Sequence, residues 1–143
     1  RGGALSDCWA ACLDWSGYGV TRGCYSDDAG NQIQKCGKSL AIRYLQLTGE
    51  EAVPLPEECY QGADIIARAK EFAEIHGDSY VDKDFEELKD ALIADALPKN
   101  IAGLQRDLGK YRIPYDVWFH ESDLQQSGAV ADVIKILMDK GAC

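Results

Sequence analysis

Two short stretches of this chain have the composition of β-strands, and the long gap between them limits its fold more than any other feature. Residues 20–25 and 115–119 are rich in β-branched and aromatic side chains. About ninety residues of mainly helical sequence separate them. Two strands do not make a stable sheet alone and normally need further strands or packing partners. We therefore expect part of a parallel α/β sheet interrupted by a helical insertion, and not a complete domain.

The rest of the chain repeats apolar residues at the three- and four-residue spacing of helices. The predicted helices cover residues 4–16, 29–47, 63–75, about 85–110, and a final stretch through Val130 and Leu137. Pro98 is expected to kink or break the fourth helix. Residues 50–58 contain Pro54 and Pro56 and are predicted to form an extended loop. The second strand, residues 115–119, is expected to be buried because of its apolar alternation.

The charge balance limits the class of protein. The 143 residues fit one domain, and 15 Lys and Arg against 24 Asp and Glu give a net charge of −9. Such a balance argues against a surface devoted to nucleic acid or to an anionic membrane. No apolar stretch is long enough to span a bilayer, and no signal peptide is visible. The chain is therefore expected to be soluble and cytoplasmic.

Six cysteines raise the question of a metal site or disulfides. They are Cys8, Cys12, Cys24, Cys36, Cys59 and Cys143, and the histidines are His76 and His120. No Cys-x-x-Cys pair is present, although structural zinc sites usually contain closely spaced ligand pairs. We expect free, partly buried thiols and no metal, with a metal- or redox-responsive thiol protein as a less favoured hypothesis.

The polar turn at residues 25–32 is the strongest candidate for a binding site. In open α/β sheets, ligands bind at the carboxyl ends of strands, and this turn follows the first predicted strand. Asp27 and Asp28 are also good N-cap residues for the next helix, and capping is the explanation that the residues alone favour. The same holds after the second strand, where Ser122 or Asp123 is expected to cap a helix. No phosphate-binding loop or nucleophile elbow is present, so no catalytic residue is predicted.

Four segments, in a consistent order, are similar to motifs of one protein family. Residues 1–18 resemble the helix that follows a His-x-Gly-His signature, and residues 20–22 with 28–33 resemble "VTR…NDAGNQI". Residues 60–62 with the helix that ends at residues 77–78 resemble a "YxG" insertion helix, and residues 116–119 followed by 121–122 are close to "FDVWFSES". The family is the bacterial type of arginyl-tRNA synthetase, a class I aminoacyl-tRNA synthetase. Each match alone is weak, but together they span the whole chain.

The resemblance implies a part of a Rossmann-type catalytic domain with a helical insertion. It divides the chain into residues 1–49 and 113–143 of the catalytic α/β domain and residues 50–112 of the insertion. It also implies an L-arginine pocket that includes Tyr25, Asp28, Asn31 and Gln32. The parent protein would use ATP with magnesium and would join L-arginine to arginine tRNA.

The resemblance also implies what the chain would lack alone. The His-x-Gly-His signature would precede Arg1, and a KMSK-like loop would follow Cys143. We therefore expect an inactive segment with no cofactor of its own, whose partner is the rest of the synthetase chain. The insertion is expected to pack against that remainder, which predicts exposed apolar surface and self-association of the isolated chain. The alternative is a non-catalytic paralogue that acts as a binding or scaffold module.

Overall fold

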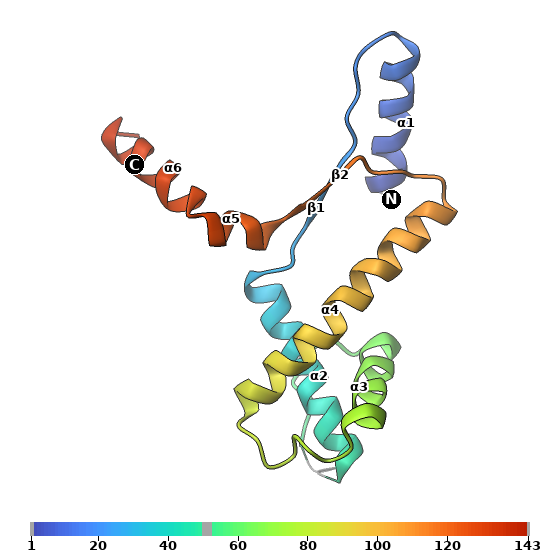
Figure 1. The fold of residues 1–143 in the computed structure, drawn as a ribbon, viewed down its shortest axis with the longest axis vertical. Helices are drawn as coiled ribbons and strands as arrows, with labels where there is room; N and C mark the ends of the chain where they lie inside the picture. Colours follow the sequence, from blue (N-terminus) through green and yellow to red (C-terminus); the bar gives the residue numbers. More distant parts are fainter. Residues whose placement is uncertain (1, 50–52, 143) are drawn as a thin grey trace. The chain divides into compact units, whose positions relative to one another are not determined.

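The computed structural model describes residues 2–49 and 53–142, and the chain folds as two compact units (Figure 1). Unit 1 comprises Arg1–Asp28 and Gln105–Cys143, and unit 2 comprises Ala29–Leu104. The elements in chain order are α1 (Gly2–Trp15), β1 (Gly23–Ser26), α2 (Gly30–Thr48), α3 (Ala63–His76), α4 (Phe85–Lys110), β2 (Val117–His120), α5 (Glu121–Ser127) and α6 (Ala129–Asp139). The predicted loop at 50–58 lies partly outside the described residues, and residues 53–58 form neither helix nor strand.

Unit 1 contains the sheet, in which β1 and β2 pair in parallel. The register places Gly23 opposite Val117 and Ser26 opposite His120. The prediction of a mostly helical chain with a few parallel strands is therefore confirmed. The first strand starts later than predicted. Arg22 precedes the strand, and its backbone is held by two hydrogen bonds to Asp116. The Arg22 N–H donates to the Asp116 carboxylate at 2.7 Å, and the Arg22 carbonyl accepts from the Asp116 N–H at 2.8 Å.

The predicted burial of the second strand is wrong for this chain. Val117 is 45% exposed and Phe119 is 40% exposed. Each strand has a single hydrogen-bonded neighbour among the described residues. A two-stranded ribbon covers little of its own faces, so an apolar alternation that suits a buried strand is left half open.

The helices of unit 1 also leave their apolar faces open. On α1, Leu5, Trp9 and Leu13 form the predicted apolar stripe, yet they are 62%, 69% and 47% exposed. On α6, Val133 and Ile134 are 54% and 48% exposed. Ile113 is the one buried hydrophobic side chain among the described residues of unit 1. Unit 1 therefore has apolar surface but hardly any core of its own.

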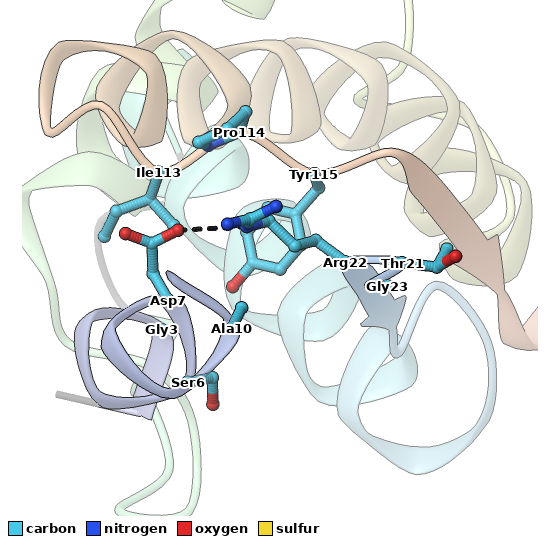
Figure 2. Close-up of a pocket in the computed structure, with 10 residues that line it drawn as sticks. All are labelled: Gly3, Ser6, Asp7, Ala10, Thr21, Arg22, Gly23, Ile113, Pro114 and Tyr115. Atoms are coloured by element: carbon cyan, nitrogen blue, oxygen red, sulfur yellow. Dashed lines mark hydrogen bonds and ion pairs between the residues drawn. The ribbon is translucent and has the colours of Figure 1, made fainter. Parts of the chain in front are cut away.

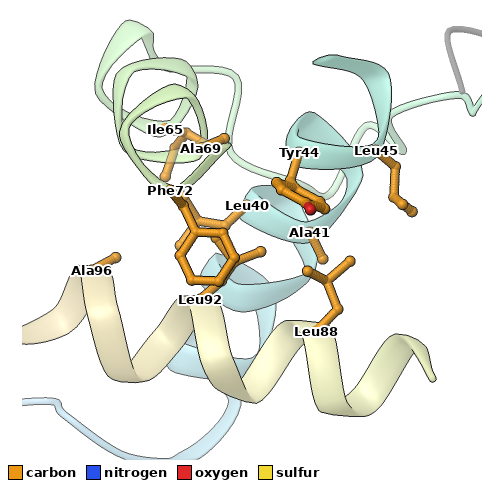
Figure 3. Close-up of a cluster of buried hydrophobic side chains, with 10 residues drawn as sticks. All are labelled: Leu40, Ala41, Tyr44, Leu45, Ile65, Ala69, Phe72, Leu88, Leu92 and Ala96. Carbon is orange, nitrogen blue, oxygen red and sulfur yellow. The ribbon is translucent and has the colours of Figure 1, made fainter. Parts of the chain in front are cut away.

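Unit 2 has a continuous core between three helices (Figure 3). The buried side chains are Leu40, Ala41, Tyr44 and Leu45 of α2, Ile65, Ala69 and Phe72 of α3, and Leu88, Leu92 and Ala96 of α4. Tyr44 and Phe72 meet edge to face, with ring centroids 5.6 Å apart. Glycines end two of these helices, because Gly49 (φ 121°) and Gly77 (φ 60°) adopt the positive φ that favours glycine.

The tyrosine hydroxyl of the core ties two connections together. Tyr44 Oη donates to the Gly77 carbonyl oxygen at 2.7 Å, at the end of α3. It also accepts from the Tyr80 N–H at 3.3 Å, in the segment that leads to α4. A buried hydroxyl with both roles filled is the arrangement that avoids a desolvation penalty.

Of the predicted kink or break at Pro98, the break is wrong. The helix runs without interruption from Phe85 to Lys110 with Pro98 inside it. Proline removes one backbone hydrogen bond, and the turn before it is held by other contacts. Ala96 is buried in the core, and Asp95 and Lys99 form an ion pair of 2.7 Å that spans the proline.

The cysteines of the described residues are all free, with unequal exposure. Cys8 and Cys12 on α1 are exposed, where partial burial was predicted, whereas Cys24 and Cys36 are half-buried and Cys59 is buried. Cys143 lies outside the described residues. Within the described ranges, no group of three or more His, Cys, Asp or Glu side chains is placed to hold a metal ion. None of the helices described is long and apolar enough to cross a membrane.

Candidate functional site

The carboxyl ends of the two strands coincide and bring polar residues from distant parts of the chain together. Ser26 and His120 are the last residues of β1 and β2, and they are paired in the sheet. The Asp27–Asp28 turn follows β1, and α5 follows β2 directly. We call Tyr25, Asp28, His120, Glu121 and Ser122 the carboxyl-edge cluster. It lies where ligands bind in open α/β sheets.

Asp28 is the centre of the carboxyl-edge cluster. Its Oδ1 accepts from the Ser122 N–H at 2.9 Å, and its Oδ2 accepts from the Ser122 hydroxyl at 2.8 Å. These bonds join residues 94 positions apart. Ser122 lies in the first turn of α5, so the Asp28 carboxylate satisfies an N–H that the helix itself leaves free. The carboxylate thus fixes the end of β1 to the start of α5.

Both capping predictions are therefore wrong. The N-cap of α2 is Ala29, and no side chain caps this helix, because the Asp28 carboxylate is engaged by Ser122 instead. The N-cap of α5 is His120, also without a side-chain cap. Ser122 acts as a donor to Asp28 and not as a cap acceptor.

His120 faces the same carboxylate. Its Nδ1 lies 3.3 Å from Asp28 Oδ2. Desolvation pushes the pKa of Asp28 upward, but the two hydrogen bonds from Ser122 act against it and hold this pKa below its ordinary value, and the charge of His120 lowers it further whenever that imidazole is protonated. Asp28 is therefore ionised at neutral pH.

Tyr25 presents the most exposed group of the cluster. Its ring stacks on Phe119 at a centroid distance of 5.8 Å, and 55% of the residue is exposed. Partial loss of hydration raises the pKa of its phenol, and the carboxylates of Glu121, Asp27 and Asp28 raise it further. These carboxylates create a negative potential around the hydroxyl, which suits a cationic ligand.

The other two residues of the predicted pocket belong to unit 2. Asn31 and Gln32 lie in the first turn of α2, and both are exposed. They line an open hollow of about 540 Å³ that also contains Lys35, Lys38 and Lys89. Gln32 Oε1 accepts a short hydrogen bond from the Tyr60 hydroxyl. The structure thus places Tyr25 with Asp28, and Asn31 with Gln32, and the assignment of all four to one pocket stays a prediction.

A second pocket lies at the opposite, amino-terminal end of the strands (Figure 2). It has a volume of about 210 Å³ and is lined by α1 and by the segments that lead into β1 and β2. Arg22 donates from Nε to Asp7 Oδ1 of α1 at 3.3 Å, and the two side chains are largely shielded from solvent. Sequence reasoning did not single out this pair. Its geometry fits a structural role, because it ties α1 to the start of the sheet.

The contacts of His120 and Ser122 with Asp28 were also not predicted from the sequence. The available signal was indirect: if the two predicted strands pair in parallel, the residues after them meet at one edge. The predicted strand ended one residue before His120, and no local pattern links residues 94 positions apart.

Comparisons with known proteins agree on one group. No family model matches the chain. Arginine–tRNA ligases of Ruminiclostridium cellulolyticum and Caldanaerobacter subterraneus are 51% and 55% identical to it over 142 and 141 residues, which is 99% of the chain. A solved structure from Campylobacter jejuni, assigned as an arginyl-tRNA synthetase, superposes with a TM-score of 0.77 at 25% identity and covers 97% of the chain.

Along almost its whole length the chain is similar to aminoacyl-tRNA synthetases, the class that its motifs resemble. Its match covers 25% of the length of each of the two ligases and 30% of the Campylobacter chain. Within that class, the chain corresponds to a segment of the arginine–tRNA ligases. These relatives are enzymes by name, and they do not support the alternative of a non-catalytic module.

Proposed function

We propose that the chain serves as part of the catalytic domain of an arginine–tRNA ligase. The whole protein would activate L-arginine with ATP and magnesium and transfer it to arginine tRNA in the cytoplasm. The observation that carries this proposal is the identity of 51–55% with arginine–tRNA ligases along almost the whole chain. A parallel pair of strands with a polar carboxyl edge agrees with a Rossmann-type catalytic fold.

The contribution of this segment would be part of the L-arginine pocket. A guanidinium group carries five donors and no acceptor, so it requires carboxylate, phenol or amide oxygens. Tyr25, Asp28, Asn31 and Gln32 supply these types, and the negative potential around Tyr25 supports the assignment. Each Asp28 oxygen accepts one bond from Ser122, so Asp28 would offer the ligand its charge and its remaining lone pairs.

The domain division is also part of the proposal. Residues 1–49 and 113–143 would belong to the catalytic α/β domain, and residues 50–112 would form its insertion. The exposed apolar faces of α1 and α6 support the view that further parts of a synthetase chain would cover them.

The test is arginine-dependent exchange between ATP and pyrophosphate, measured with arginine tRNA present. The parent protein is expected to show exchange with L-arginine and not with L-lysine, and the 143-residue chain alone is expected to show none. A parent protein without arginine-dependent exchange would disprove the assignment of function. Exchange above background by the isolated chain would disprove the expectation that this segment is inactive alone.

The pocket assignment has a separate test in the parent protein. Replacing the amide in Asn31→Ala should raise KM for L-arginine by about tenfold, which corresponds to about 1.4 kcal/mol, with little change in KM for ATP. Gln105→Ala is the control, because Gln105 is an exposed amide on α4 that the pocket does not involve. Equal effects of the two substitutions would remove Asn31 from the pocket.

A further inference from the structure

The pair formed by Asp28 and His120 contains a buried imidazole nitrogen whose state the proposed arginine pocket does not explain. His120 Nδ1 has almost no solvent-exposed surface and no hydrogen-bond partner, although it lies 3.3 Å from Asp28 Oδ2. The side chain as a whole is 31% exposed. The exposed part of the imidazole must therefore be on the other ring atoms, and a buried nitrogen without a partner would be costly.

The cost is avoided when the neutral imidazole carries its proton on Nδ1. A neutral imidazole carries its proton on either Nδ1 or Nε2, and the nitrogen without it is an acceptor. Asp28 is ionised and accepts only, and a carboxylate has about four lone-pair positions, of which Ser122 uses two. A proton on Nδ1 would satisfy the buried nitrogen and give Asp28 a third donor. At 3.3 Å the two atoms are within reach of each other, but the ring orientation in the structure does not form the bond, so the bond requires a rotation of the ring.

We propose that Asp28 is a positioning residue that holds neutral His120 in the Nδ1–H tautomer, so that Nε2 is a hydrogen-bond acceptor at the carboxyl edge of the sheet. The other ionisable groups of this edge are Tyr25, Asp27 and Glu121, which carry no positive charge. The site therefore suits a ligand group that donates a hydrogen bond, such as an ammonium or a guanidinium.

The tautomer can be read directly by nitrogen-15 NMR of the 143-residue chain, independently of the proposed function. The chain has two histidines, and a His76→Gln variant assigns their ring signals. At a pH where both rings are neutral, we expect His120 to have a proton on Nδ1 and none on Nε2. The ratio of tautomers should differ by tenfold or more from that of the chain unfolded in urea, because the hydrogen bond goes to a charged acceptor. An Nε2–H tautomer in the folded chain would overturn the proposal.

A matched pair of substitutions tests the same geometry without the imidazole. In His120→Asn the side-chain amide takes the place of Nδ1, and in His120→Gln it takes the place of Nε2. The readout is the amide proton of Ser122, which is bonded to Asp28 Oδ1. We expect Asn to preserve its chemical shift and Gln to move it, while the Phe72 ring signals of unit 2 stay unchanged as a control for folding. Equal shifts in the two variants would contradict the proposal.

Discussion

The hydroxyl of Tyr44 offers a sharp test of how unit 2 is held together. Tyr44→Phe keeps the ring against Phe72 but removes the bonds to the Gly77 carbonyl and the Tyr80 N–H. A neutral hydrogen bond contributes about 0.5–1.5 kcal/mol net. Gly77 is exposed, so water can replace part of its bond, whereas Tyr80 is half-buried. We expect a loss of about 1–2 kcal/mol in the free energy of unfolding of unit 2.

Urea unfolding followed by far-UV circular dichroism measures this loss. For a domain of 60–100 residues, each kcal/mol also lowers Tm by roughly 4–8 °C. All tryptophans, Trp9, Trp15 and Trp118, belong to unit 1, so tryptophan fluorescence should be nearly unaffected. Tyr111→Phe is the control, since Tyr111 is 80% exposed and should change stability by less than about 0.5 kcal/mol. If Tyr44→Phe were no more destabilising than this control, the hydroxyl would not join the two connections.

The same tyrosine predicts a pH dependence. Burial raises the pKa of Tyr44 above its ordinary value, although the bond from the Tyr80 N–H acts in the opposite direction. The unfolded chain therefore loses the phenol proton first as the pH rises. Stability from this group is present below about pH 10 and decreases above it. Urea midpoints measured across this range should fall less steeply for Tyr44→Phe than for the unchanged chain, and parallel curves would refute the argument.

Three further predictions concern other parts of the chain. A side chain at Gly37 would place Cβ 2.7 Å from Ile93 Cγ1 and 2.8 Å from Lys89 Cγ. Gly37→Ala should therefore destabilise unit 2 in urea, because overpacking costs about 1–3 kcal/mol and exceeds the helix-propensity gain of about 1 kcal/mol. Ile93→Val should recover part of the loss, and a more stable Gly37→Ala would show that the helices are not in close contact. Because the pKa of Asp28 is lowered, its stabilisation of the fold is present above its ordinary pKa and is lost as the pH falls through its folded pKa. The chemical shift of the Ser122 amide proton, which is bonded to Asp28, should therefore change in acid. A constant chemical shift, or the same transition in Asp28→Asn, would show that Asp28 does not cause this pH dependence. The open apolar faces of α1 and α6 predict self-association of the isolated chain by light scattering and binding of an apolar dye, and a monomer that binds no dye would count against it.

The sequence by itself determined the helices of unit 2 closely. Residues 29–47 and 63–75 were predicted, and α2 and α3 end within one residue of these limits. The reason is local: apolar spacing defines the buried face, and Gly49 and Gly77 supply the positive φ that ends each helix. The sequence also indicated a parallel pair of strands and a similarity to the arginyl-tRNA synthetases, through motifs spread over the chain.

Only the tertiary structure decided which partners the polar groups take and how much of each apolar face is covered. Asp28 has the local features of a helix cap, yet its carboxylate binds Ser122, 94 residues away, because parallel pairing brings the ends of β1 and β2 to one edge. Val117 has the pattern of a buried strand but stays half exposed, since coverage depends on neighbours that its own sequence does not specify. Helix propensity and spacing act over a few residues, whereas hydrogen-bond partners and burial are set by contacts between distant segments.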